Sequence, residues 1–153
     1  YAAGLSLKEE NLDAFTQRFL KLATDEIIPE QMTPQIDIDA VLDLQDINAK
    51  FMSELKKMNP FGPDNQKPVF CSLGVKDYGT SKLVGKDLEH IKLELIDDKS
   101  NTPIHGIAFG MHQHNTHIKN MKPFNICYTI EENTYNGNTS LQLMVKDIKE
   151  NDI

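Results

Sequence analysis

Two patterns of apolar and polar positions divide the chain. In the first part, apolar residues recur every three or four positions, which is typical of amphipathic helices. One such stripe predicts a helix over residues 6–27, begun by a capping box between Ser6 and Glu9. A second stripe predicts a helix that follows Asp46 as its cap. Between these helices, the alternation at residues 36–40 predicts a short, half-exposed strand.

From Pro68 onward the apolar period changes to two, which predicts strands. The Asn136-Gly137 pair predicts a tight hairpin, because both turn residues tolerate positive φ. The first strand needs a bend or bulge near Asp77, and residues 112–123 form a longer irregular connection. Five strands are expected, at residues 69–85, 90–96, 104–111, 124–133 and 139–148.

The five short strands predict a small closed β-barrel, because closure removes the exposed edges of an open sheet. The fold class is therefore α+β, a five-stranded OB-like β-barrel preceded by two helices and a connector. An SH3-like barrel and an open sheet packed by the two helices are the alternatives.

Composition adds limits on class and location. The chain has 153 residues, so one domain, or one with an appendage, is expected. It contains no apolar run long enough to span a bilayer, which predicts no membrane association. Cys71 and Cys127 lie in apolar runs without CxxC spacing, which favours a reducing compartment. The chain begins at Tyr1 rather than Met, and we interpret it as a piece of a longer protein.

Net charge is −7, which argues against indiscriminate nucleic-acid binding. The charge is unevenly spread, since residues 1–66 carry 12 Asp and Glu against 6 Lys and Arg, whereas residues 67–153 carry 11 against 10. A basic face is therefore possible in the second part.

No catalytic residue is predicted, because the sequence has no nucleophilic triad in a recognisable frame and no Gly-rich phosphate loop. Three histidines, His112, His114 and His117, suggest a metal site, since neutral imidazoles bind zinc or nickel. No acidic or cysteine ligand lies near them in the sequence, so a solvated polar loop is the alternative.

Single-stranded nucleic acid needs cations that follow the phosphates and flat side chains on which bases stack. In an OB-like barrel, the middle strands and two of the loops form the usual ligand face. Ordinary solubilising lysines, and a tyrosine that packs across its hairpin, are the alternative explanation. The candidate nucleic-acid contacts are Lys82, Lys86, His90, Lys92, Tyr135 and Lys146.

Several short motifs resemble, in the right order, the C-terminal region of RecJ-type single-stranded-DNA-specific exonucleases. Ala2-Ala3-Gly4-Leu5, with Asn11, Leu12 and Phe15, is similar to the end of that family's DHH-associated domain. The OB-fold motifs are Pro60-Phe61-Gly62-Pro63-Asp64-Asn65, Pro68-Val69-Phe70, His90-Ile91-Lys92-Leu93, Ala108-Phe109-Gly110-Met111, Asn133, Tyr135-Asn136-Gly137, Gln142-Leu143 and Asp147-Ile148.

The resemblance implies three parts: residues 1–31 as the remnant of a DHH-associated domain, residues 32–58 as a connector strand and helix, and residues 59–153 as an OB-fold domain that binds single-stranded DNA. It implies a bacterial, cytoplasmic parent enzyme that degrades single-stranded DNA from the 5′ end in repair and recombination. Mn²⁺ or Mg²⁺ would bind in a DHH domain outside this chain, and the chain itself would need no cofactor and have no nuclease activity.

Expected partners are single-stranded DNA, the remainder of the nuclease and repair proteins. Asp64 stands where the family commonly has Gly, and Gln66 where it has Pro, so no DNA contact is assigned to this loop. Two other functions are open alternatives. One is a module that braces the nuclease and docks proteins without contacting DNA. The net charge of −7 and the scarcity of arginine, which occurs only as Arg18, favour this alternative. The other is an autonomous metal-binding protein.

Overall fold

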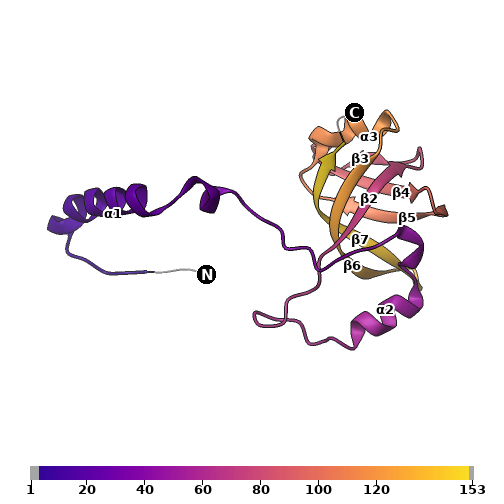
Figure 1. Cartoon of the computed structure of the whole chain (residues 1–153), viewed down its shortest axis with the longest axis horizontal. Coiled ribbons are helices and arrows are strands. Elements are labelled where there is room, and N and C mark those ends of the chain that lie inside the picture. Colours follow the sequence, from indigo (N-terminus) through magenta and orange to yellow (C-terminus); the bar gives the residue numbers. More distant parts are fainter. Residues whose placement is uncertain (1–3, 152–153) are drawn as a thin grey trace. The chain divides into compact units, whose positions relative to one another are not determined.

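The structure is a computed structural model that describes residues 4–151, without the side chains of residues 29, 30 and 135. The chain divides into two compact units, residues 1–36 and 37–153. The first contains the helix α1 (Leu12–Glu26) between two 3-10 turns, η1 (Glu9–Asn11) and η2 (Pro29–Met32) (Figure 1). No residue of α1 is buried, and its apolar stripe lies exposed.

The second unit contains the sheet, two α-helices and two 3-10 turns. The helical elements are η3 (Leu44–Asp46), α2 (Ala49–Lys56), η4 (His112–His114) and α3 (Asn115–Lys119). The strands are β1 (Ala40–Val41), β2 (Phe70–Asp77), β3 (Lys82–Val84), β4 (His90–Asp97), β5 (Ser100–Ala108), β6 (Phe124–Tyr135) and β7 (Asn138–Glu150).

Five of the strands close into a ring, in the order β2-β6-β7-β5-β4, and β2 pairs again with β4. Strands β5 and β7 run parallel, and the other neighbours in the ring run antiparallel. This closure confirms the predicted OB-like barrel and excludes an open sheet. Outside the ring, β1 pairs with β2 and β3 pairs with β4.

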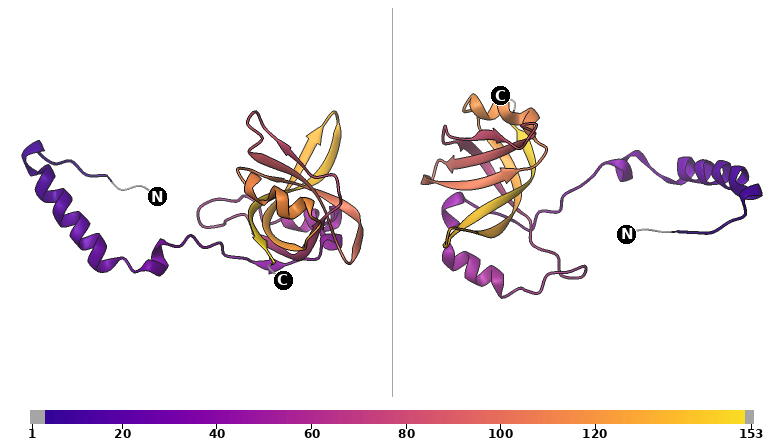
Figure 2. Two further views of the ribbon diagram at one scale, coloured as in Figure 1. Left: turned by 90° about the horizontal axis from the view of Figure 1, so that it is seen from above. Right: turned by 180° about the vertical axis from the view of Figure 1, so that it is seen from behind.

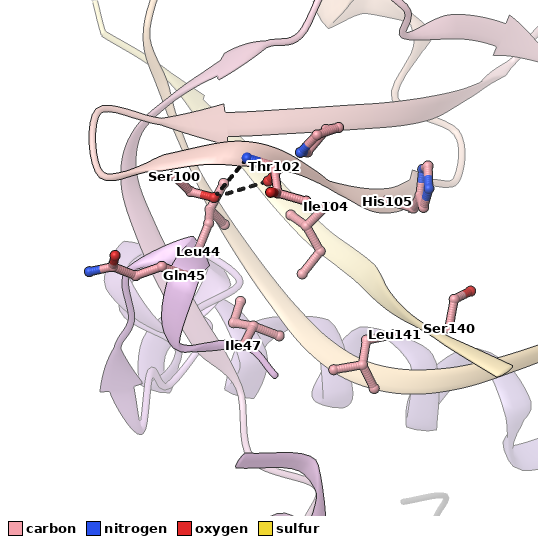
Figure 3. A pocket seen from close by; sticks show the side chains of 10 residues that line it. Leu44, Gln45, Ile47, Ser100, Thr102, Ile104, His105, Ser140 and Leu141 are labelled. Atoms are coloured by element: carbon pink, nitrogen blue, oxygen red, sulfur yellow. Dashed lines mark hydrogen bonds between the residues drawn. The ribbon is translucent and has the colours of Figure 1, made fainter. Parts of the chain in front are cut away.

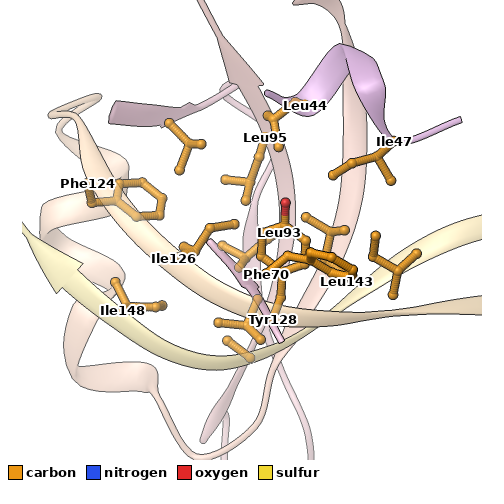
Figure 4. Close-up of a cluster of buried hydrophobic side chains, with 14 of the residues drawn as sticks. Leu44, Ile47, Phe70, Leu93, Leu95, Phe124, Ile126, Tyr128, Leu143 and Ile148 are labelled. Atoms are coloured by element: carbon orange, nitrogen blue, oxygen red, sulfur yellow. The ribbon is translucent and has the colours of Figure 1, made fainter. Parts of the chain in front are cut away.

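Alternating residues of the strands fill the barrel. On β4, Ile91, Leu93 and Leu95 are completely buried, so the residues between them point outward. The aromatic ring of Tyr128 lies at the centre of this core (Figure 4). The Ser72 hydroxyl donates its hydrogen to the carbonyl of Leu42. The Tyr128 hydroxyl is therefore the donor in its 2.7 Å hydrogen bond to Ser72 Oγ. Burial raises the pKa of the Tyr128 phenol.

Both ends of the barrel are covered by helical segments. At one end, α3 inserts the fully buried Ile118, and α2 lies at the opposite end (Figures 1 and 2). The predicted irregular connection at residues 112–123 therefore contains η4 and α3. Leu44, Ile47 and Leu55 also pack into the core, so η3 and α2 belong to the barrel unit.

Several local predictions need correction. The first helix begins at Leu12 rather than at residue 6, so Ser6 does not cap it. Asn48, not Asp46, caps α2, since its side chain accepts from two backbone N–H groups. Strand β5 begins at Ser100 rather than at residue 104, so only two residues separate it from β4. Asn136 and Gly137 both have positive φ, which confirms the predicted hairpin.

The predicted strand over residues 69–85 is in fact two strands, β2 and β3, separated by a bend. The fully buried Asp77 holds this bend, because its Oδ1 accepts the backbone N–H of Ser81 at 3.1 Å. Ser81 Oγ then accepts the N–H of Glu94 at 2.9 Å on β4. These bonds let the chain leave the ring at Asp77 and pair again with β4 as β3.

Replacing Asp77 is expected to loosen this bend. Asp77→Ala leaves the Ser81 N–H without its acceptor and should lower the free energy of unfolding by about 2–3 kcal/mol. Asp77→Asn keeps an oxygen at that position and loses only the ion pair with Lys119, at 3.7 Å, so it should lose about 1 kcal/mol. Urea denaturation measures both, and equal losses would show that the Ser81 bond does not hold the bend.

Candidate nucleic-acid interface

Four of the predicted contacts lie on one outer face of the barrel. Lys82 on β3 is the register partner of Lys92 on β4, and both side chains are exposed. His90 lies two residues before Lys92 and therefore points to the same side. In the next strands, Lys92 pairs with Ile107 and Ile107 with Met144, which places Lys146 on this side too. We call Lys82, His90, Lys92 and Lys146 the basic face.

Ion pairing distinguishes these lysines from most others on the barrel. Elsewhere, Lys56 lies 2.7 Å from Glu132, Lys67 lies 2.7 Å from Glu131, and Lys99 lies 2.7 Å from Asp43. Among residues 4–151, no ion pair within 4.0 Å includes a lysine of the basic face or Lys86. Their charges are thus available to an anionic ligand.

Lys86 extends the basic face into the turn between β3 and β4. This turn needs Gly85, whose φ is +96° and where a Cβ would approach the Glu89 carboxylate at 3.1 Å. That carboxylate accepts the Asp87 N–H at 3.0 Å and lies 3.3 Å from His90 Nε2. Hydrogen bonds from the backbone of Glu89 itself and of Asp87 lower the pKa of Glu89. The turn therefore carries a negative charge that partly offsets Lys86.

A second acidic group limits the face on its other side. Glu94 points outward on β4, two residues beyond Lys92, and lies 3.6 Å from His105 Nδ1. Its carboxylate also accepts the hydroxyl of Thr80. Because the Thr80 hydroxyl donates to it, Glu94 is partly engaged and is a weaker acceptor for further donors than a free carboxylate would be.

Tyr135 lies far from the basic face. Its backbone pairs with Asn138 at the β6–β7 hairpin, and its side chain is outside the described residues. Lys146 is eight residues further along β7, a separation of about 26 Å at the usual rise per residue. The structure therefore brings four of the six predicted residues together, puts Lys86 at the adjoining turn, and leaves Tyr135 at the opposite end.

Sequence reasoning missed Phe109, an aromatic residue beside the basic face. Its side chain is 55% exposed and meets the ring of His90 edge to face, with centroids 4.9 Å apart. The His90 ring is itself fixed, because its Nδ1 accepts the Gly110 N–H at 3.0 Å. The sequence did contain a pattern from which Phe109 could have been predicted. Alternation along residues 107–109 places Ala108 in the core and Phe109 outward.

Glu150 contacts two of the three histidines of the metal prediction. His114 Nδ1 lies 2.7 Å from Glu150 Oε1, and His117 Nδ1 lies 3.2 Å from Glu150 Oε2. His117 Nε2 donates to the carbonyl of Pro123 at 3.2 Å, whereas His112 is exposed. Within the described part of the chain, no group of three or more His, Cys, Asp or Glu side chains could hold a metal ion. The arrangement instead ties α3 to the end of β7.

Two further findings concern the described residues. Cys71 on β2 and Cys127 on β6 are register partners and free thiols, and burial raises the pKa of both.

Among residues 4–151, no helix has the length and apolar character needed to cross a membrane.

Comparison with known protein families matches residues 38–147 to the RecJ OB domain. The chain belongs to the RecJ OB domain family. The match covers β1, η3, α2 and the barrel up to residue 147 in β7, and so includes every residue of the basic face.

Curated relatives agree with this assignment. The chain is 27% identical over 147 residues to the single-stranded-DNA-specific exonuclease RecJ of Salmonella typhimurium, covering 96% of this chain and 25% of that protein. It is 26% identical over 147 residues to RecJ of Bacillus subtilis, covering 95% of this chain and 18% of that protein. The chain thus spans a quarter or less of these relatives' length.

A solved structure supports the fold of this RecJ OB domain. The crystal structure of RecJ in complex with Mn²⁺ from Thermus thermophilus matches with a TM-score of 0.74 and 17% identity, covering 98% of this chain and 21% of that one. A structure of the same protein with Mg²⁺ matches with a TM-score of 0.72, 16% identity, and coverage of 97% and 21%. The donor groups of residues 4–151 do not fit such ions, so no metal-dependent step is assigned to this chain.

Proposed function

We propose that the barrel binds single-stranded DNA across the basic face and guides it to a nuclease centre in another part of a longer RecJ-type protein. The observation that carries this proposal is the gathering of Lys82, Lys92 and Lys146 on one side of the barrel, where none of them has a carboxylate partner among the described residues. The parent enzyme would be the bacterial, cytoplasmic 5′→3′ exonuclease of repair and recombination that the sequence resemblance implies, with Mn²⁺ or Mg²⁺ bound in its DHH domain.

The binding energy on this face would come from two kinds of contact. The lysines neutralise phosphates and release counterions, which makes the affinity depend on salt concentration. The exposed ring of Phe109 offers a surface for one base, and His90 supports its edge. Because the strand is held by both its backbone and a base, it cannot slide freely off the face.

Guiding a strand contributes to catalysis although the barrel performs no bond cleavage. Holding the DNA near the nuclease centre lowers the entropic cost of presenting the scissile bond. We propose that residues 1–31, with the exposed stripe of α1, are the end of a DHH-associated domain, and that the missing remainder of that domain covers Phe15 and Phe19. Residues 32–58 would then form the connector, and residues 59–153 the DNA-binding domain.

A second candidate is a module that braces the nuclease and docks repair proteins without contacting DNA. The observation in its favour is the ring stacking of Phe15 and Phe19, with centroids 5.8 Å apart, on an otherwise uncovered helix. Such a surface fits a protein partner better than a nucleic acid. The two candidates differ in whether the lysines of the basic face affect DNA affinity.

Removing the two register-paired lysines tests the proposal. Lys82→Ala with Lys92→Ala should weaken binding of a labelled single-stranded oligonucleotide and reduce the slope of log affinity against log salt by about 1.4, or about 0.7 per lost phosphate contact. Fluorescence anisotropy at several salt concentrations measures the slope. Lys50→Ala on α2, an exposed lysine away from this face, is the control and should leave it unchanged. An unchanged slope in the double variant would favour the bracing module.

Unlike the lysines, Phe109 should contribute to binding through its aromatic ring. Phe109→Ala should weaken single-strand binding by about 1–3 kcal/mol, the usual value of a stacked base, without changing the salt slope. Phe109→Tyr keeps the aromatic face and should restore affinity, whereas Phe109→Leu should not. The same anisotropy titration measures all three. Equal affinity for the Leu and Tyr variants would show that Phe109 contributes only apolar bulk.

A further inference from the structure

The sheet opens between β5 and β7 at the end of the barrel away from α3. The first register pair of these parallel strands is His105 with Gln142, although β5 begins at Ser100 and β7 at Asn138. Among the described pairings, residues 100–104 of β5 have no partner on β7. The strands therefore part here, with η3 beside them, and leave an open groove of about 460 Å³.

The lining of this groove is apolar at its centre and polar at its ends. Ile47, Ile104 and Leu141 line the middle, whereas Gln45 and Ser100 lie at one end and His105 and Ser140 at the other (Figure 3). The lining includes no lysine, arginine, aspartate or glutamate. Such a groove suits a flat, neutral group with hydrogen-bonding edges better than an ion.

The groove adjoins the basic face on the side of Glu94, which is the register partner of His105. His105, which lines it, lies two residues before Ile107, the register partner of Lys92. Two residues of strand span about 7 Å, so a DNA strand that contacts Lys92 and runs towards Ser140 passes over the groove. The group that such a strand would present there is one of its bases.

We propose that this groove takes one unstacked nucleobase of the single strand held by the basic face. This inference rests on the proposed function. It also separates two roles, because the lysines neutralise phosphates of single and double strands alike, whereas a base inside a duplex is paired and stacked and does not enter the groove. The groove therefore selects single strands, and the lysines supply affinity.

The test compares a deoxythymidine oligonucleotide with an abasic oligonucleotide of equal length, which carries the same phosphates. The test uses the Phe109→Ala background, in which the groove is the remaining proposed base site. This variant should bind the deoxythymidine oligonucleotide about tenfold more tightly, the effect of roughly one lost base contact. The further substitutions are added to the same background. Ser140→Phe should fill the groove from β7 and bring this ratio close to one, while the salt slope stays the same. Thr102→Phe fills it from β5 and should act likewise, which covers the case in which one variant does not fold.

Two controls separate this inference from the proposed function. Ser53→Phe adds the same ring at an exposed position of α2 that does not line the groove, and it should keep both the ratio and the slope. Lys92→Ala should lower the slope and keep the ratio. If both groove-filling variants keep the tenfold ratio, the groove is not the base site, although the basic face still stands. If the unchanged chain binds neither oligonucleotide, the proposed function fails and the inference with it.

Discussion

The closure of the barrel at Asp77 is the constraint on which the rest of the structure depends. At this residue the chain completes the ring with β4 and then turns outward, held by the bond from Ser81. The chain then pairs with β4 a second time as β3, which places Lys82 opposite Lys92. A buried carboxylate is costly without partners, and among the described residues Asp77 has one hydrogen bond to Oδ1, whereas Oδ2 has none and lies 3.7 Å from Lys119 Nζ. The bend and the Ser81 bond therefore stabilise each other. The geometry of the basic face is thus fixed from inside the barrel.

Charge is distributed so that the net value of −7 does not describe the ligand face. Lysines near α2 and the β4–β5 turn, such as Lys56 and Lys99, are engaged by carboxylates at 2.7 Å, whereas those on β3, β4 and β7 are not. At physiological salt, interactions between exposed charges are screened beyond a Debye length of about 8 Å. A ligand on the basic face is therefore affected mainly by the nearby lysines, and a locally basic surface can exist on an acidic protein. Phe109 and the groove beside His105 add contacts that charge alone does not supply.

Alternation of apolar residues predicted the ring strands because one face of each strand is buried against a single core. The sequence also placed a bend near Asp77, but it did not show that β2 ends there and that the chain resumes as a separate strand, β3, because this depends on the contact of Asp77 with Ser81 rather than on periodicity. The helix caps were also misplaced, because Asp46 and Asn48 are equally suitable by residue type and only the fold selects Asn48. The outward positions of the lysines followed from the alternation. Tyr135 was grouped with them because sequence alone does not reveal at which end of the barrel the β6–β7 hairpin lies.

The most direct test of the account is a nuclear magnetic resonance titration of the isotope-labelled chain with a single-stranded oligonucleotide. The account predicts that backbone amide signals shift around Lys82, Lys92, Phe109 and Lys146 and stay in place on β1 and α2. Shifts concentrated on β1 and α2, or no shifts at all, would contradict the claim that this face of the barrel binds DNA.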